Sequence, residues 1–203
     1  MILARPHERV EYQQYLISDL REKLIPAHIY SASVLKLGFE NLNLLDFGCG
    51  YGFVSLSIAE LPIKNLKVYA CDSQEDFLDV LWGRIAHRNE QKVTAFHLPN
   101  RSQIFFPDWL PKMNYVICSF SISALEHPEI GLPAIVKSVA KGTHFHFVEW
   151  DAEKTHPQIE ILYPANARIP HADFKHLLRR SGLEVTFEEI DKNPYYQFKA
   201  KKT

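Results

Sequence analysis

The chain has 203 residues, enough for one well-buried α/β domain and short for two. Hydrophobic residues make up 46% of it and charged residues 23%, values typical of a soluble globular protein. The 23 Lys and Arg nearly balance the 24 Asp and Glu, so the net charge of −1 gives no electrostatic reason to expect a nucleic acid or an anionic membrane as the main partner.

The cysteines and the first residues bear on the compartment. Cys49, Cys71 and Cys118 are odd in number and form no CxxC pair, which argues against a disulfide framework or a cysteine zinc site. Residues 1–10 lack the apolar core of a signal peptide, and no uncharged apolar run is long enough to span a bilayer. We therefore expect a cytoplasmic protein with no membrane span.

The first part of the chain has a helical pattern. Residues 7–24 read as one amphipathic helix, and a second short helix covers 28–37. The apolar residues at helical spacing are Val10, Leu16, Ile17, Leu20 and Leu24. We expect a single domain, 1–203, in which residues 1–40 form a helical lid and 41–203 form an α/β core.

Strands and helices then alternate. Apolar runs predict strands over 42–47, 66–71, 92–98, 114–120 and 143–150, and helices over 53–60, 73–89, 128–140 and 171–182. Ser73 is the expected N-cap of the second of these helices. Residues 183–190 and 195–200 predict a closing hairpin. This order indicates a mostly parallel sheet covered on both faces, with an antiparallel strand at the end.

A glycine-rich turn joins the first strand to the first helix. Leu45 to Gly52 read LDFGCGYG, at the carboxyl edge of the sheet where open α/β folds bind ligands. The spacing is GxGxG, and Phe53 stands where a dinucleotide fingerprint needs its third glycine. No GxxxxGK[ST] run exists, which argues against a P-loop.

Asp72 ends the second strand, 24 residues beyond Gly48, and in a βαβ unit this position faces the glycine loop. A carboxylate there can accept hydrogen bonds from both ribose hydroxyls of an adenosine. The alternative is a tight turn without a ligand, with Asp72 only preceding Ser73 at the helix start. The loop and the carboxylate together favour an adenosine site.

LLDFGCGYG (44–52) followed by VYACDSQEDFL (68–78) resembles motifs I and II of class I S-adenosylmethionine-dependent methyltransferases. The resemblance continues through 114–150 and the late helix at 171–182, and covers roughly residues 30–200. It implies a Rossmann-like, doubly wound, mostly parallel seven-stranded sheet with an antiparallel C-terminal strand. It also implies methyl transfer from S-adenosyl-L-methionine to a small-molecule acceptor.

The resemblance implies cofactor-binding residues at the ends of the first four strands. They are Asp46, Gly48, Cys49, Gly50, Asp72, Ser73, Leu98, Asn100, Ser119 and Phe120. Asp46 and the loop from Gly48 to Gly50 would hold the methionine end of the cofactor, and Asp72 would bind the ribose. Ser73, Leu98 and Asn100 would edge the adenine. Ser119 and Phe120 would lie near the sulfonium. The chain departs from the family pattern at Asn114, where Asp is usual, and at Pro99 and Asn100, where a carboxylate is common.

His127 is the candidate catalytic base, because it follows the fourth strand on the ligand side; the alternative is a helix-start histidine before Pro128. Glu149, Trp150 and Asp151 end the fifth strand and are candidates to line a substrate pocket.

Other motifs have ordinary explanations. His144 and His146 lack a third metal ligand, so no metal site is expected. The run Asn193 to Tyr196 looks like the NPPY motif of amino-directed nucleic-acid methyltransferases, but it falls in the final hairpin turn. Cys118 lacks the Pro-Cys context of cytosine methyltransferases, and a buried apolar cysteine is the simpler reading.

Two alternatives stay open beside the small-molecule enzyme, in which residues 1–40 and 151–170 would form the lid and the pocket. One is a non-catalytic methyltransferase-fold binding module or partner subunit. The other is a nucleic-acid or protein methyltransferase, which the balanced charge disfavours. The acceptor and the oligomeric state cannot be read from these residues.

Overall fold

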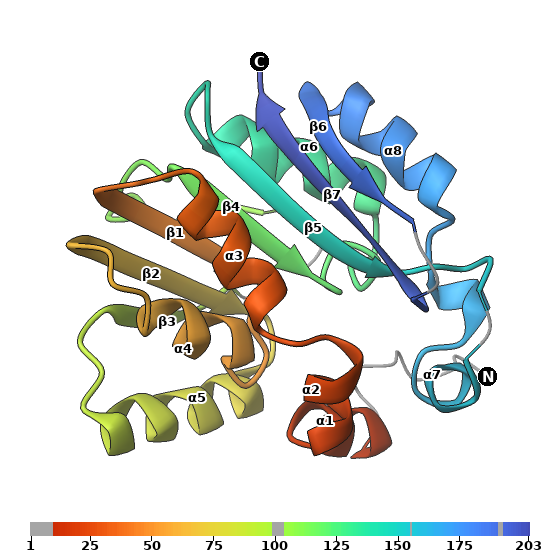
Figure 1. Ribbon diagram of the computed structural model, residues 1–203, viewed down its shortest axis with the longest axis horizontal. Helices are drawn as coiled ribbons and strands as arrows, with labels where there is room; N and C mark the ends of the chain where they lie inside the picture. Colours follow the sequence, from red (N-terminus) through yellow and green to blue (C-terminus); the bar gives the residue numbers. More distant parts are fainter. Residues whose placement is uncertain (1–9, 99–103, 155, 191–192) are drawn as a thin grey trace.

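The computed structural model describes residues 10–98, 104–154, 156–190 and 193–203, and its centre is one seven-stranded sheet (Figure 1). In spatial order the strands are β3 (Val93–His97), β2 (Asn65–Asp72), β1 (Asn41–Phe47), β4 (Tyr115–Ser119), β5 (His144–Trp150), β7 (Tyr195–Lys202) and β6 (Leu183–Glu189). The first five strands are mutually parallel, and β7 is antiparallel to both its neighbours. This confirms the predicted fold class.

Helices cover both faces of the sheet, which explains the continuous apolar strands. One hydrophobic cluster joins α3 (His28–Lys36), α4 (Phe53–Ala59) and α5 (Glu75–Arg88) to the sheet. A second cluster joins α6 (Pro128–Ser138) and α8 (His171–Arg180) to the opposite face. No helix of the part of the chain that the structure describes is long and apolar enough to cross a membrane.

The order of strands reverses between β1 and β4. The chain runs outward from β1 through β2 to β3, and then returns to the other side of β1 to build β4 and β5. The carboxyl ends of β1 and β4 lie side by side, with Phe47 paired to Cys118. Open α/β sheets bind their ligands beside such a switch point.

The single helix predicted over 7–24 is wrong, because two helices occupy its described part. These are α1 (Val10–Leu16) and α2 (Asp19–Leu24). Between them Ser18 has an extended backbone, with φ −88° and ψ 156°, and its hydroxyl donates to the Tyr15 carbonyl oxygen at 2.7 Å. A serine that satisfies a helix carbonyl locally competes with helix continuation. The chain therefore bends here.

The connection over 151–170, expected to be a long loop, contains helix α7 (Pro157–Leu162) and a 3₁₀ turn (Ala165–Ala167). Both α1 and α7 lie beyond the carboxyl ends of the parallel strands (Figure 1), and they contact each other. The two segments expected to form a lid and a pocket thus meet on the ligand side of the sheet.

Candidate functional site

The turn after β1 is held close to the sheet by its own backbone. The N–H groups of Gly48 and Cys49 both donate to the Cys71 carbonyl oxygen, at 2.9 and 3.0 Å. Gly48 has φ +72°, and a Cβ on it would lie 2.4 Å from the Ser121 Cβ. A side chain there would force both strain and a clash, so the loop needs glycine.

Asp72 meets this loop directly. The Gly50 N–H donates to its Oδ2 at 2.8 Å, and the Gln74 N–H donates to its Oδ1 at 2.9 Å. The predicted convergence of the glycine loop and the strand-end carboxylate is therefore present. The prediction that Ser73 caps α5 is wrong: Gln74 is the N-cap residue, and Asp72 supplies the carboxylate at the helix start.

An open cavity of about 1050 Å³, a volume that includes solvent at its mouth, lies over the loop. The predicted cofactor-binding residues that line it are Asp46, Gly48, Cys49, Gly50, Asp72, Ser73, Leu98, Ser119 and Phe120. Asn100 and the neighbouring Pro99 lie outside the described residues.

His127 is placed elsewhere. It is the N-cap residue of α6, its side chain is half exposed, and its Nδ1 lies 3.2 Å from a carboxylate oxygen of Glu129. It does not line the cavity. Its assignment as a catalytic base stays a prediction.

Asp46 brings an unmatched acceptor to the cavity. Its Oδ2 accepts the Ser55 hydroxyl at 2.5 Å, whereas its buried Oδ1 has no hydrogen-bond partner among the described residues. Burial raises the pKa of this carboxyl to about 6. A buried carboxylate oxygen that lacks a donor is costly unless a ligand supplies one, so the site fits a ligand with a cationic or N–H donor at this point.

The N-terminal helices supply a cation that the sequence did not predict. Arg21 of α2 lines the cavity and is buried, and its guanidinium lies 3.5 Å from the centre of the Phe53 ring. Leu16 of α1 lies 3.8 Å from where a Cβ on Gly50 would be. No motif of the sequence marks Arg21; its place in the cavity wall depends on how α2 packs over the site.

The end of β4 is held firmly. Phe120 has φ +56°, a rare conformation for a bulky side chain that is frequent at functional sites. Its ring stacks on Trp150 with the centroids 4.3 Å apart, and its N–H donates to the Val148 carbonyl oxygen at 2.7 Å. Ser119 shares a hydrogen bond of 2.6 Å with the buried Tyr30 hydroxyl. These contacts fix the two residues expected near the sulfonium.

The residues expected to line a substrate pocket at the end of β5 lie behind the cavity wall instead. None of Glu149, Trp150 and Asp151 is among the lining residues, and all three are almost fully buried. Glu149 accepts the Ile122 N–H at 2.8 Å and the Ser123 hydroxyl at 2.6 Å. Trp150 supports Phe120 from behind. Glu149 and Trp150 therefore support the wall without forming its surface, whereas Asp151 lies outside the cavity.

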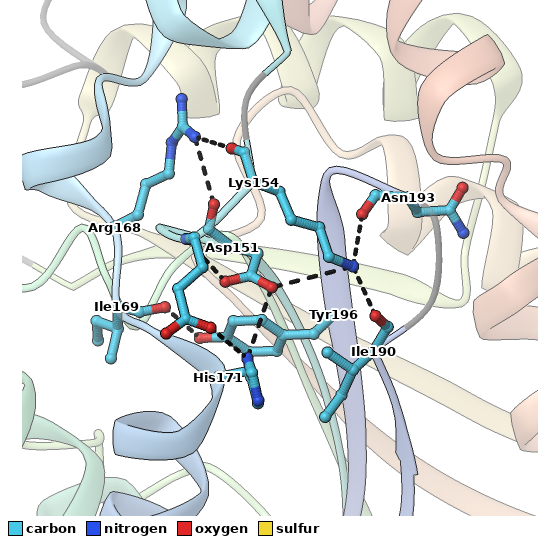
Figure 2. Close-up of polar contacts among 9 residues, drawn as sticks. Asp151, Lys154, Arg168, Ile169, His171, Ile190, Asn193 and Tyr196 are labelled. Atoms are coloured by element: carbon cyan, nitrogen blue, oxygen red, sulfur yellow. Dashed lines mark hydrogen bonds and ion pairs between the residues drawn. The ribbon is translucent and has the colours of Figure 1, made fainter.

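Arg168 fixes the connection that carries Tyr163 to the cavity. Its guanidinium donates to the carbonyl oxygens of Asp151 and Lys154 at 3.3 and 3.0 Å (Figure 2). It also donates to the carbonyl oxygen of Tyr163 at 2.6 Å. It also forms an ion pair of 2.9 Å with Glu160. Tyr163 lines the cavity opposite α1, with its ring 6.0 Å from that of Tyr12.

Asp151, Glu153 and His171 are the one group in the described ranges with spacing suited to a metal ion. The His171 Nδ1 lies 3.1 Å from Glu153 and 3.7 Å from Asp151. Lys154 already places its ammonium 4.0 Å from Asp151 (Figure 2). An ion-pair cluster explains this arrangement, which lies outside the cavity.

Asn114, one of the departures from the family pattern, lies at the amino end of β4. Its side-chain oxygen accepts the Asn43 N–H at 2.7 Å. It therefore joins two strands at the sheet edge opposite the cavity, and the departure leaves the cofactor-binding residues untouched.

Comparison with known proteins agrees with this geometry. A family model described as a methyltransferase domain matches residues 45–145, about half the chain, including the glycine loop and Asp72. No curated protein gives a significant match in sequence.

Several solved structures have the same fold. A SAM-dependent methyltransferase from Aquifex aeolicus is 19% identical, with a TM-score of 0.76 over 97% of this chain and 98% of its own. The [4+2]-cyclase SpnF is 14% identical, with a TM-score of 0.71 over 87% and 81%. Magnesium protoporphyrin IX methyltransferase from Synechocystis PCC 6803, solved with bound SAM, is 14% identical, with a TM-score of 0.64 over 96% and 81%.

The sheet order and the cavity at its switch point define a protein of the Rossmann-like methyltransferase fold. With the matched domain, the chain belongs to the class I S-adenosylmethionine-dependent methyltransferase family, whose cofactor is S-adenosylmethionine.

Proposed function

We propose that the protein transfers the methyl group of S-adenosylmethionine to a small-molecule acceptor in this cavity. The observation that carries the proposal is the contact of Asp72 with the glycine loop inside the cavity, at 2.8 Å from the Gly50 nitrogen. This arrangement supports binding of an adenosine at the switch point of the sheet.

The proposed roles of the lining residues follow from their chemistry. Asp72 binds the ribose hydroxyls, and Ser73 and Leu98 edge the adenine. The family resemblance adds Asn100, outside the described residues, to the adenine side. The backbone from Gly48 to Gly50 approaches the methionine part, because no side chain stands in the way. The unmatched Oδ1 of Asp46 supports binding of the amino group there.

Arg21 completes the charge pattern of the site. The cofactor carries a carboxylate, and the buried guanidinium of Arg21 lines the same cavity as Asp46. A guanidinium forms strong paired hydrogen bonds with a carboxylate. We assign Arg21 to the cofactor carboxylate, so α2 closes over the cofactor.

The bound cofactor supplies an already activated methyl group. The protein's part is to align the acceptor with that methyl and to exclude water, which in favourable cases can supply up to roughly 7–11 kcal/mol. Ser119 and Phe120 border the reaction centre, while Tyr12 and Tyr163 cover it from the lid side. We propose that residues 1–40 form this lid on a single domain.

A titration calorimetry experiment with S-adenosylmethionine and S-adenosylhomocysteine tests the cofactor site. We expect saturable binding of both below millimolar concentration. If neither ligand binds, the assignment of the cavity is wrong. Incubation with small-molecule acceptors and isotope-labelled cofactor then tests transfer.

A second function is a binding module without methyl transfer. The similarity to SpnF, a protein named as a cyclase, supports it, since this fold also occurs outside methyl transfer. Cofactor binding together with transfer to any acceptor would exclude this second reading.

We also propose a reducing, cytoplasmic location. Cys49, Cys71 and Cys118 are all free and buried, and burial raises the pKa of each thiol, so none is primed for disulfide formation.

A further inference from the structure

Behind the cavity wall, a series of hydrogen bonds joins a buried carboxyl group to Tyr163, a residue that lines the cavity. The Ser123 hydroxyl donates to Glu149 Oε2 at 2.6 Å, and the Ser123 Oγ lies 3.1 Å from the Tyr163 hydroxyl oxygen. Tyr163 lines the cavity. The series of hydrogen bonds therefore runs from the protein interior toward the space in which an acceptor would lie.

The charge of Glu149 is not balanced by a cation of the described residues. The side chain is fully buried, and no Lys, Arg or His in those ranges forms an ion pair with it. Burial raises its pKa to about 7, although its hydrogen bonds oppose the shift. The carboxyl therefore changes protonation near neutral pH, the range in which a general base works best.

Besides Tyr163, three described titratable groups interact electrostatically with Glu149: Tyr12 of α1, Cys118 of β4 and Tyr196 of β7. Burial raises the pKa of each above its ordinary value, so all three are neutral at pH 7. Glu149 is thus the group that titrates near neutrality in this cluster.

We propose that Tyr163, Ser123 and Glu149 form a relay that takes the proton from an aromatic hydroxyl as it accepts the methyl group. This inference rests on the proposed function and names its acceptor class. The acceptor oxygen forms a bond to the methyl carbon, while the carbon–sulfur bond breaks and its electron pair stays on sulfur. The acceptor proton moves to Tyr163, the Tyr163 proton to Ser123, and the Ser123 proton to Glu149 Oε2.

An aromatic hydroxyl is the acceptor that suits this relay. The cavity wall carries several aromatic rings, against which a flat acceptor packs; they are Tyr12, Phe47, Tyr51, Phe53, Phe77, Phe120 and Tyr163. A phenol has a pKa of about 10, like tyrosine, so it is protonated at neutral pH and gains from a base. A carboxylic acid is already ionised there and needs none.

The test uses the full chain, S-adenosylmethionine, and three probes: phenol, catechol and 4-hydroxybenzoate. We expect mass spectrometry to find a methyl ether of at least one, with a rate that rises with pH through a midpoint near 7. Glu149→Gln keeps the side chain's size but takes up no proton. It should lower kcat by about 100- to 10,000-fold and abolish the rise, with cofactor affinity unchanged.

Tyr163→Phe gives a second variant, since Glu149→Gln also touches the loop after β4. This variant leaves the carboxyl group of Glu149 in place but removes the hydroxyl that links Ser123 to the cavity. It should reduce kcat by at least about tenfold. The controls Glu184→Gln, at an exposed site, and Tyr69→Phe, away from the cavity, should leave kcat unchanged.

Three results would overturn the relay. One is cofactor binding without methylation of any of the three phenols, and another is a rise with pH that persists in Glu149→Gln. The third is full activity in Tyr163→Phe. If the unchanged protein does not bind S-adenosylmethionine at all, the proposed function itself is wrong, and the relay is wrong with it.

Discussion

At the residue scale, Asp72 ties two elements together at the cavity. It accepts the N–H groups of Gly50 and Gln74, one on each oxygen. These bonds fix the carboxylate between the glycine loop and the start of α5, where it lines the cavity. Its place at the end of an apolar strand is what made it predictable from the sequence.

Replacing Asp72 with alanine should weaken the binding of S-adenosylmethionine. Loss of charge-assisted hydrogen bonds costs about 1.5–3 kcal/mol, or roughly 10- to 150-fold in affinity. Titration calorimetry measures this effect. Asp76→Ala removes an exposed carboxylate from the start of α5 and should leave the affinity unchanged. Equal affinities of all three proteins would refute the ribose role.

Arg21→Met tests the assignment of the cofactor carboxylate. The variant should bind S-adenosylhomocysteine roughly 10- to 150-fold more weakly, because a charged hydrogen bond is lost. It should bind 5′-methylthioadenosine, which has no carboxylate, as well as the unchanged protein does. Lys23→Met, at an exposed position of the same helix, is the matched control. An equal loss of affinity for both ligands would mean that Arg21 only holds the structure of the N-terminal helices.

At the element scale, the sheet was predictable, whereas the N-terminal helices and the connection over 151–170 were not. Each core strand is a compact apolar run, and the glycine loop is a local signal, so the predicted strands and the sheet's antiparallel ending are confirmed. The shape of the other two segments depends on contacts between distant parts of the chain. Ser18 breaks the predicted helix, and Arg168 fixes α7 through carbonyl oxygens that no sequence pattern marks.

Arg168→Met should loosen the connection between β5 and α8. Its guanidinium bonds three carbonyl oxygens and Glu160, so the variant leaves buried acceptors unmatched. We expect a loss of roughly 3 kcal/mol in the free energy of unfolding, measured with urea. Arg179→Met, at an exposed site on α8, is the control. Equal stability of the two variants would show that Arg168 does not hold the connection.

At the scale of the whole molecule, the buried acids make stability depend on pH. Burial raises the pKa of Asp46 to about 6 and of Glu149 to about 7, while it lowers the pKa of His146 to about 4. The acids favour the folded state at lower pH, and the histidine opposes them below its ordinary pKa of 6.5. These effects partly cancel, so a single curve of stability against pH does not separate them.

The difference in free energy of unfolding between Glu149→Gln and the unchanged protein reports on Glu149 alone, because every other group titrates in both proteins. The folded state keeps a proton on Glu149 up to about pH 7, whereas the unfolded chain releases it near 4.5. Burying the charge of Glu149 therefore does not lower the free energy of unfolding below pH 4.5, and lowers it by the full amount above about pH 7. From pH 5 to 8 the variant should gain about 2–3 kcal/mol in free energy of unfolding relative to the unchanged protein. Urea unfolding at several pH values measures it, and a constant difference would mean that Glu149 is ionised throughout and unsuited to accept a proton.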